Sequence, residues 1–306
     1  MEPLTVVPDL SIVLVCWNNR AYMESCLESL FIADLPFTTE IVAVDNGSAD
    51  GSLEMLAEDY PAVRVIRNQT NVGLSCASNQ GIESTSGRYV LLLNNDTLVN
   101  STLAHLVEFL DEHPEAGAAG GKLLNPDGSL QATFADFSSL WQEFLIATGL
   151  GRTFWPNYPD HQMVNAPRPV DWVSSACLML RRVSVEQVGE LDEQYFIYGD
   201  EVDLCYRLKQ AGWRVYFLPE VHTVHFGGRS MNRWSRRRMV YRGKILFYHK
   251  NYGPAATATF RLMLALLTVP KLVFWMVTTA FRYHREQAAK EIQSNLDVLR
   301  LCVGFS

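Results

Sequence analysis

Four short apolar runs in the first 100 residues, each followed by a polar turn, are the feature that most constrains the fold of this chain. They lie at residues 11–16, 41–45, 63–66 and 89–93, and a weaker run follows near 116–124. The runs are continuous rather than alternating, which is typical of strands buried on both faces of a sheet. Helical patterns separate them. Alternating strands and helices predict a parallel sheet with right-handed crossover connections.

The helical patterns place apolar residues three and four positions apart between the predicted strands. They cover residues 22–31, 52–58, 74–83 and 101–112. Later in the chain, strands are predicted at 170–180 and 213–218, and helices at 182–188 and 204–211. The segment 126–170 is rich in proline and aromatic residues, and we expect it to form loops.

Polar residues follow four of the predicted strands directly. In parallel sheets, ligands bind at the carboxyl ends of the strands, so these turns should converge on one site. A structural explanation is open for each single turn, because turns favour the same residue types. The four turns are Trp17-Asn18-Asn19, Asp45-Asn46-Gly47-Ser48, residues 68–73, and Asn94-Asn95-Asp96.

The charge of the chain is distributed unevenly. The 306 residues carry a net charge of −7, but residues 221–285 contain no Asp or Glu and 12 of the 26 Lys and Arg. The remainder holds 14 basic and 33 acidic residues. An acidic body with a basic segment indicates an anionic partner for that segment, which is phosphate, a phospholipid surface or nucleic acid.

Cysteine usage and the N-terminus both favour the cytoplasm. The six cysteines form no CxxC pair, which argues against a disulfide framework or a zinc cluster and favours reduced thiols. The first 15 residues have no basic start and no small-residue cleavage site, so we predict no signal peptide.

The chain lacks the usual glycine-rich phosphate-binding motifs. It has neither GxGxxG after the first strand nor GxxxxGK[ST] anywhere, which argues against a dinucleotide dehydrogenase and a P-loop enzyme. A divalent metal is the natural substitute for neutralising a diphosphate. Asp96 offers a hard oxygen ligand of the type that Mg²⁺ or Mn²⁺ takes, and His225 is a candidate second ligand. A buried, hydrogen-bonded histidine is the alternative explanation for His225.

Three carboxylates cluster at the predicted start of a helix. Asp200, Glu201 and Asp203 either complement the helix dipole or include a general base, because clustered carboxylates raise one another's pKa. Asp45 likewise has two explanations. It either accepts a hydrogen bond from a ribose or base, or it caps the helix that follows.

A 20-residue apolar stretch at 262–281 is interrupted by Pro270 and Lys271. Its length would span a bilayer, but a central lysine argues against a simple span. Three possibilities remain: a segment lying on the membrane, a helix packed on the body or on a second subunit, and a true span. The arginines from Arg229 to Arg242 would bind phosphate or anionic lipid.

Seven motifs, taken in order, carry a family resemblance. They are SIVLVCWNN, VAVDNGSADGS, NVGLSCASNQG, YVLLLNNDT, WVSSACLMLRR, VGELDEQYFIYGDEVDLCYRLKQAGW and HFGGRS. Over about residues 10–250 the chain resembles the family 2 glycosyltransferases, and within them the rhamnosyltransferase-like branch. This resemblance implies a GT-A fold, a nucleotide-diphosphate sugar donor, Mg²⁺ or Mn²⁺, and inversion at the anomeric carbon.

The resemblance also implies roles for single residues on the donor side. The nucleotide-binding positions are Asp45, Asn71, Gly73, Asn79 and Asn94. Asp96 stands at the acidic end of the family's DxD-type motif and is the implied metal ligand, together with His225.

On the acceptor side, the family's base is the second acid of an acidic pair. Here the pair is Asp200-Glu201, so Glu201 is the implied base and Asp200 is the alternative candidate for that role. Trp172 and Asp203 are the implied acceptor or sugar pocket.

These features together predict a GT-A, Rossmann-like, mostly parallel α/β sheet in residues 1–220, with a nucleotide half near 10–125 and an acceptor half near 126–220. Residues 221–306 form a basic, apolar helical region. The predicted function is transfer of a sugar, preferably L-rhamnose, from dTDP-rhamnose or a UDP-sugar to a glycan or polyprenyl-diphosphate-linked acceptor at the cytoplasmic membrane face.

Two other interpretations of the sequence are kept open. The chain could be a sugar nucleotidyltransferase or a catalytically impaired nucleotide- or glycan-binding protein. A homo-oligomer is compatible with either, and no nucleic-acid partner is predicted.

Overall fold

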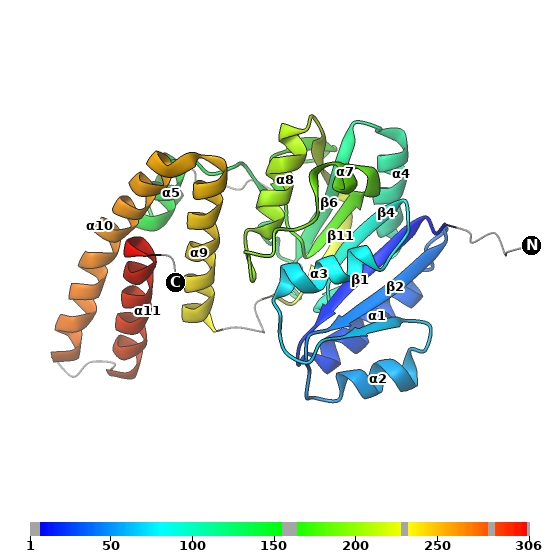
Figure 1. Ribbon diagram of the computed structural model, residues 1–306, viewed down its shortest axis with the longest axis horizontal. Coiled ribbons are helices and arrows are strands. Elements are labelled where there is room, and N and C mark those ends of the chain that lie inside the picture. The colour runs from blue at the N-terminus through cyan, green and yellow to red at the C-terminus, as the bar shows by residue number, and fades with distance from the viewer. Residues whose placement is uncertain (1–6, 155–163, 228–231, 281–284, 305–306) are drawn as a thin grey trace, which may run out of the picture. The chain divides into compact units, whose positions relative to one another are not determined.

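The computed structural model describes residues 7–154, 164–227, 232–280 and 285–304 (Figure 1). The chain divides into two compact units. The sheet unit comprises Met1–Phe137, Pro159–Phe196 and Asp200–Ser230, and the helical unit comprises Ser138–Tyr158, Ile197–Gly199 and Met231–Ser306.

The sheet unit is built on a mixed, mostly parallel sheet with the strand order β3-β2-β1-β4-β10-β6-β11-β5. Its strands are β1 (Leu10–Cys16), β2 (Thr39–Asp45), β3 (Arg64–Arg67), β4 (Tyr89–Asn94), β5 (Thr97–Leu98), β6 (Ala116–Leu124), β10 (Cys177–Arg181) and β11 (Arg214–His225). Strand β8 (Arg168–Val170) pairs with β11, while β7 (Phe134–Ala135) and β9 (Trp172–Val173) form a separate pair. Strands β1 to β4 pair in parallel, and β10 runs antiparallel to both β4 and β6.

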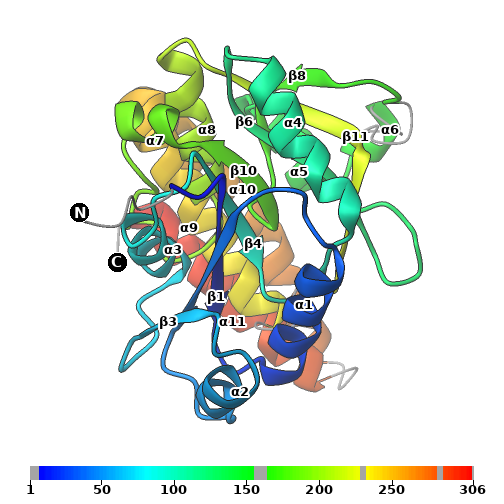
Figure 2. The same cartoon turned by 90° about the vertical axis from the view of Figure 1, so that its right-hand side faces the viewer.

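Helices cover both faces of this sheet. They are α1 (Arg20–Ile32), α2 (Ser52–Asp59), α3 (Leu74–Glu83), the 3₁₀ helix η1 (Ser101–Leu103), α4 (Ala104–Glu112), α7 (Arg182–Val188) and α8 (Asp200–Gln210). Figure 2 shows α1 and α4 on one side of the sheet and α3 and α7 on the other. Successive strand side chains point to opposite faces, so Ile12 packs with α1 and α4, whereas Val13 packs with α3 and α8. The result is the predicted three-layer α/β architecture.

Three sequence expectations differ from the structure. The run near 63–66 is β3, an edge strand whose side chains are mostly exposed, because it pairs on one side with β2. The segment 170–180 forms parts of three strands instead of one, since β8, β9 and β10 pair with different partners. The sheet also continues past the expected boundary at 220, because β11 runs to His225.

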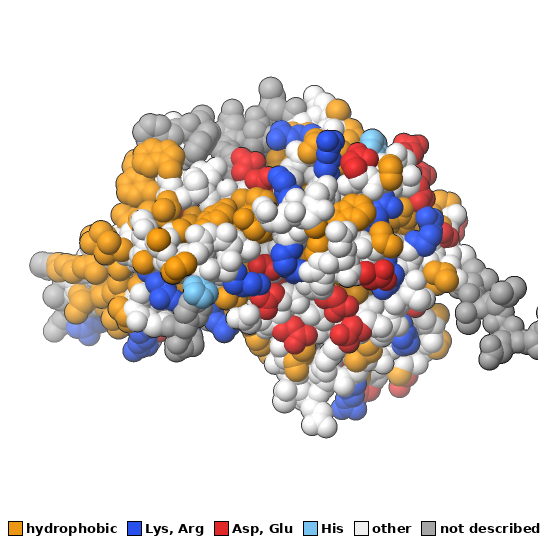
Figure 3. Space-filling model, turned by 45° about the horizontal axis from the view of Figure 1, so that its top comes forward, with side chains coloured by type: hydrophobic (Ala, Val, Ile, Leu, Met, Phe, Trp, Pro, Cys, Tyr) orange, Lys and Arg blue, Asp and Glu red, His pale blue; other side chains and the backbone are white. Residues whose placement is uncertain are grey.

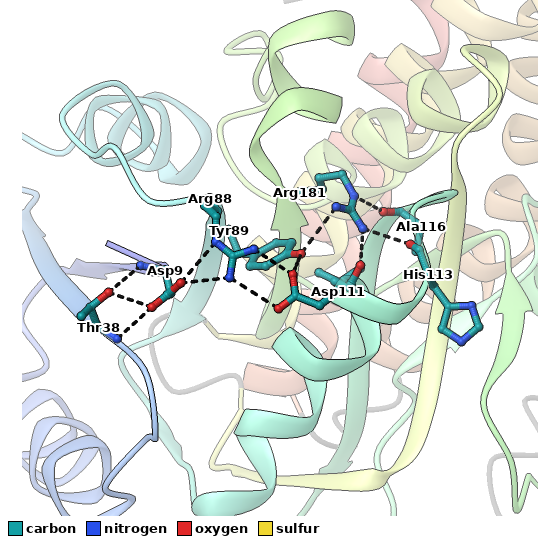
Figure 4. A network of polar contacts seen from close by, with 9 residues as sticks. Asp9, Thr38, Arg88, Tyr89, Asp111, His113, Ala116 and Arg181 are labelled. Atoms are coloured by element: carbon teal, nitrogen blue, oxygen red, sulfur yellow. Dashed lines mark hydrogen bonds and ion pairs between the residues drawn. The ribbon is translucent and has the colours of Figure 1, made fainter. Parts of the chain in front are cut away.

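A polar network joins the starts of β4 and β6 to the end of β10 (Figure 4). Arg88 pairs with Asp9 at 2.9 Å and with Asp111 at 2.8 Å. Arg181 donates from Nε to the carbonyl of Ala116 at 2.8 Å. Tyr89 donates its hydroxyl to Asp111 at 2.7 Å. These contacts tie together the sheet edge opposite the carboxyl ends of the parallel strands β1, β2 and β4.

The helical unit contains α5 (Leu140–Thr148), α6 (Gly151–Phe154), α9 (Arg233–Asn251), α10 (Gly253–Ala280) and α11 (Arg285–Val303). Helix α5 lies in the segment expected to be loops. It forms because Ser139 and Gln142 make a capping box ahead of an apolar run. It contacts α10, and its buried Glu143 accepts two hydrogen bonds of 2.7 Å from Lys244 on α9.

Candidate active site

The turn after β2 is held by the carboxylate of Asp45. This side chain is fully buried, and its Oδ2 accepts hydrogen bonds from the backbone amides of Gly47 (3.2 Å) and Ser48 (3.1 Å). Its Oδ1 has no hydrogen-bond partner among the described residues. Asp45 therefore shapes the turn and does not cap α2, whose N-cap is Gly51, and it still has an unsatisfied acceptor for a ligand donor.

Asn46 organises the loop that carries two predicted nucleotide-binding residues. Its Nδ2 donates to Asn71 Oδ1 at 3.2 Å and to the carbonyl of Gly73 at 3.1 Å. Its Oδ1 accepts from Asn68 Nδ2 at 3.1 Å. The structure thus brings Asn71 and Gly73 beside the end of β2, as predicted. Asn46 itself was not singled out, although its position directly after Asp45 is the signal that could have identified it.

Helix α3 begins against the segment that leads towards the acidic pair. Gly73 has φ +97°, and a Cβ at this position would lie 2.9 Å from Phe196. The next amide, that of Leu74, donates to the Phe196 carbonyl at 2.7 Å. Ser75 donates its hydroxyl to the Tyr195 carbonyl at 2.6 Å. The backbone approach at Gly73 explains why this position has no side chain.

Asn79 has a different role from the one implied by the resemblance. Its Nδ2 donates to the Leu191 carbonyl at 2.8 Å, and its Oδ1 accepts from the Leu191 amide at 3.1 Å. Nδ2 also lies 3.2 Å from Glu193 Oε1. With 6% of its surface exposed, the side chain is committed to holding the 191–193 segment against α3. It positions the neighbouring segment and does not point into an open cleft.

Asp200 faces a narrow cleft at the carboxyl ends of β1 and β4. The cleft is lined by Val13, Val15, Leu74, Ser78, Leu92, Leu93, Asn94, Ser175, Leu191 and Asp200. Asp200 is buried, and neither carboxylate oxygen has a hydrogen-bond partner within the described parts of the chain. Burial, followed by the charge of Glu201, raises the pKa of Asp200 well above its ordinary value. Glu201 is half-buried in the first turn of the same helix.

The two predicted metal ligands lie together at the end of β4. His225 Nε2 is 3.2 Å from Asp96 Oδ1 and 3.3 Å from Asn94 Nδ2. The backbone amide of Phe226 donates to the Asp96 carbonyl at 2.9 Å, which aligns the ends of the two segments. Asn94 also lines the Asp200 cleft. It therefore connects the acidic pair with the Asp96–His225 pair.

The donor set at this point suits a hard cation that is shared with a ligand. Among the described residues, no group of three or more His, Cys, Asp and Glu side chains is arranged to hold a metal. Asp96 and His225 supply one oxygen and one nitrogen, so further ligands would come from outside the protein, as a diphosphate provides.

The predicted acceptor residues are placed differently from one another. Asp203 is fully buried, accepts from Arg207 Nε at 2.8 Å and lies 3.4 Å from the Tyr195 hydroxyl. This pairing makes Asp203 a structural residue instead of a pocket residue. Trp172 is half-buried on β9, and its indole nitrogen donates to the Asp136 carbonyl at 3.4 Å.

Comparisons with known proteins identify the family of this chain. Glycosyl transferase family 2 matches residues 11–189. The N-acetylglucosaminyl-diphospho-decaprenol L-rhamnosyltransferase of Mycobacterium tuberculosis is 31% identical, covering 73% of this chain and 78% of its own. The rhamnosyltransferase WbbL of Escherichia coli is 21% identical, covering 70% and 82%.

A solved structure shows the same fold. It is the mannosyltransferase PcManGT from Pyrobaculum calidifontis in complex with GDP-Man and Mn²⁺, and it is 15% identical to this chain. It covers 98% of this chain and 87% of its own, with a TM-score of 0.57. The GT-A fold class and the rhamnosyltransferase-like resemblance inferred from the motifs are thereby confirmed. The chain belongs to glycosyl transferase family 2, and it is a glycosyltransferase.

Proposed function

We propose that this glycosyltransferase moves a sugar, L-rhamnose as the first choice, from a nucleotide-diphosphate donor to a hydroxyl of a lipid-linked glycan, with inversion. The observation that carries the proposal is the meeting of two pairs, Asp200–Glu201 and Asp96–His225, at Asn94. The mycobacterial relative, whose name includes a diphospho-decaprenol acceptor, supports the sugar and the acceptor class.

The acidic pair divides two roles between its members. The raised pKa favours the neutral form of Asp200, in which its carboxyl group can donate a hydrogen bond to a ligand oxygen. Glu201, the second acid of the pair, is the proposed base. It takes the proton from the acceptor hydroxyl while that oxygen attacks the anomeric carbon from the face opposite the nucleotide.

The donor would be bound by the residues around Asp96 and His225 and by the turn that follows β2. Asp96 and His225 would hold Mg²⁺ or Mn²⁺, which when bound stabilises negative charge on the diphosphate. Asp45 Oδ1, unsatisfied in the structure, would accept from the nucleotide base. The loop held by Asn46 brings Asn71 and Gly73 against the same nucleotide.

A lipid-linked acceptor also accounts for the surface of the helical unit. Helix α10 over Gly253–Thr279 is long and apolar enough to cross a membrane, and 11% of its most apolar window is buried. A core helix of a soluble protein would be mostly buried, so this face suits lipid. Figure 3 shows hydrophobic side chains gathered at the left of the molecule, over this unit. Among the described residues, the exposed large apolar side chains of this unit are those of Trp141, Ile146, Leu150, Leu262, Leu266, Val269, Val273, Phe274, Met276, Val277 and Val303.

The charge of the helical unit favours a bilayer with anionic lipid. No Asp or Glu occurs from residue 221 to 285, and Arg236 and Arg238 are exposed near the start of α9, where Arg233 instead pairs with Glu291 of α11. Basic residues beside an apolar face are typical of helices that lie on the membrane surface. We place the enzyme at the cytoplasmic face on this basis. Arg229, which was predicted to join this basic group, lies outside the described residues.

The donor test measures release of nucleoside diphosphate from a set of sugar nucleotides, with and without Mn²⁺, in the full chain. Metal-dependent release from dTDP-rhamnose that is lost in Glu201→Gln and kept in Glu220→Gln would support the proposal, since Glu220 is exposed on β11. Release that persists in Glu201→Gln would remove Glu201 as the base. Nucleotide binding without release, even with a lipid-linked acceptor, would favour a binding protein.

The membrane test measures co-flotation of the full chain with vesicles that contain anionic lipid. The double variant Leu266→Asp, Phe274→Asp, which places two charges at exposed positions of α10, should abolish flotation. Gln287→Asp, which adds a charge at an exposed position of α11, should preserve most of the flotation. Equal flotation of the two variants would refute the assignment of this apolar face to lipid.

A further inference from the structure

Gln131 contacts the predicted metal-binding histidine at two points. Its Oε1 lies 2.9 Å from His225 Nδ1, and its Nε2 donates to the His225 backbone carbonyl at 2.5 Å. The two residues are 94 positions apart in the chain. Gln131 follows the Pro126–Gly128 turn, and no sequence pattern marked it.

The surroundings of Gln131 determine which way its amide points. The His225 carbonyl can only accept a hydrogen bond, and Nε2 donates a second one to Asn125 Oδ1 at 2.9 Å. Asn125 keeps its oxygen towards Gln131 because its own Nδ2 donates to the Ser129 hydroxyl at 2.9 Å. Asp127 in turn accepts from the Ser129 amide and hydroxyl, at 2.9 and 2.6 Å. The Gln131 Oε1 must therefore face His225 Nδ1.

An acceptor opposite Nδ1 selects one form of the neutral imidazole. Nδ1 carries the hydrogen, and Nε2 is left with its lone pair. Nε2 is the nitrogen that lies 3.2 Å from Asp96 Oδ1, with Asn94 Nδ2 in place to donate to it at 3.3 Å. A lone pair facing a carboxylate oxygen at this distance is unfavourable by itself, and a cation shared by the two atoms relieves it.

We propose that Gln131 is a positioning residue that holds His225 in the Nδ1–H tautomer and thereby presents Nε2, beside Asp96, to the cation of the donor complex. The cation part rests on the proposed function, whereas the tautomer part does not. Partners on the second nitrogen of a metal-binding histidine commonly change metal affinity by about 10–100-fold.

Two measurements on the full chain test this. The first is the pair of imidazole ¹⁵N chemical shifts of His225, without metal, at a pH about two units above the ordinary histidine pKa of about 6.5. The second is the dissociation constant of Mn²⁺ with nucleoside diphosphate present, followed by electron paramagnetic resonance. Neither measurement requires turnover. The signal of His225 among the seven histidines is assigned with His225→Gln.

Three variants separate the tautomer effect from damage to the loop. Gln131→Leu, which removes the acceptor, should shift His225 towards a mixture of tautomers and raise the dissociation constant of Mn²⁺ by about 10–100-fold. Gln131→Glu keeps an acceptor opposite Nδ1 and should retain the wild-type tautomer. Pro126→Ala loosens the same exposed turn, while every side chain that orients the Gln131 amide stays in place, and should leave both readouts near the wild type.

Unchanged ¹⁵N shifts in Gln131→Leu would overturn the proposal, as would an equal effect of Pro126→Ala on them. If wild-type protein binds no Mn²⁺, the proposed donor site is wrong, and the ¹⁵N shifts still decide the role of Gln131.

Discussion

Replacement of Gly73 by alanine should destabilise the sheet unit more than the same replacement at any open turn. Gly73 has φ +97° and ψ 166°, a combination that residues with a side chain avoid. A Cβ would also lie 2.9 Å from both the ring and the carbonyl oxygen of Phe196. That carbonyl cannot easily move, because it accepts the Leu74 amide at 2.7 Å.

The chain offers a matched control for the backbone effect. Gly189 has nearly the same conformation, with φ 82° and ψ 162°. Among the described residues, a Cβ there would meet only the Arg207 Nη1 atom, at an ordinary 3.8 Å. Gly189→Ala should therefore cost the backbone strain alone, about 1–3 kcal/mol. Gly73→Ala adds overpacking against Phe196, about 1–3 kcal/mol more.

The assay is urea unfolding of the full chain, followed by tryptophan fluorescence and by far-ultraviolet circular dichroism. The expected result is that Gly73→Ala has a free energy of unfolding about 1–3 kcal/mol below that of Gly189→Ala, with similar m-values. Equal values for the two variants would refute the reasoning, because the close approach to Phe196 would then carry no energetic weight.

Three further predictions concern charge. Because its pKa is raised, Asp200 of the folded wild type keeps a proton that the unfolded chain releases above about pH 4. The wild type should therefore lose stability relative to Asp200→Asn as the pH rises above about 4, by up to about 1.4 kcal/mol per pH unit, measured by unfolding at a series of pH values. A parallel pH dependence in the two proteins would contradict this. In Arg88→Met, the free energy of unfolding should fall less steeply as the pH drops below about 4. Arg88 lowers the pKa of Asp111 and, after Thr38, contributes to the lowered pKa of Asp9. The same pH dependence as in the wild type below about pH 4 would contradict this pairing. Lys244→Met should lower the free energy of unfolding by about 3–5 kcal/mol, because it leaves buried Glu143 unpaired. Adding Glu143→Leu should restore most of this stability in thermal unfolding. No recovery in the double variant would show that the loss comes from packing and not from charge.

The architecture of the first 125 residues could be predicted because its signals are local. Strands β1, β2 and β4 contain short apolar runs, and each of them is followed by a turn that belongs to the site. Once parallel pairing is inferred, Asp45, Asn71 and Asn94 must reach the same edge of the sheet. The acidic residue Asp96 and the distant His225 were paired by the family motifs, and the structure places them 3.2 Å apart.

The parts that could not be predicted depend on contacts between distant single residues. Strand β10 lies antiparallel between β4 and β6, and no period in the sequence encodes that insertion. Asn79 looked like a cleft residue, yet its partner Leu191 is 112 positions away. Asp203 looked like part of the acidic site, but Arg207, one helical turn later, neutralises it. Gln131 is a single glutamine near a loop, and its position opposite His225 appears only in three dimensions.

Helix α5 depends on partners that are synthesised much later than the helix itself. Glu143 leaves the ribosome 101 residues before Lys244, the cation that neutralises it inside the helical unit. Until α9 and α10 have been synthesised, α5 has neither its ion pair nor its apolar neighbours. Nascent chains of this protein, and fragments that end near residue 230, should therefore require chaperone protection over residues 138–154, even when every strand of the sheet is already present.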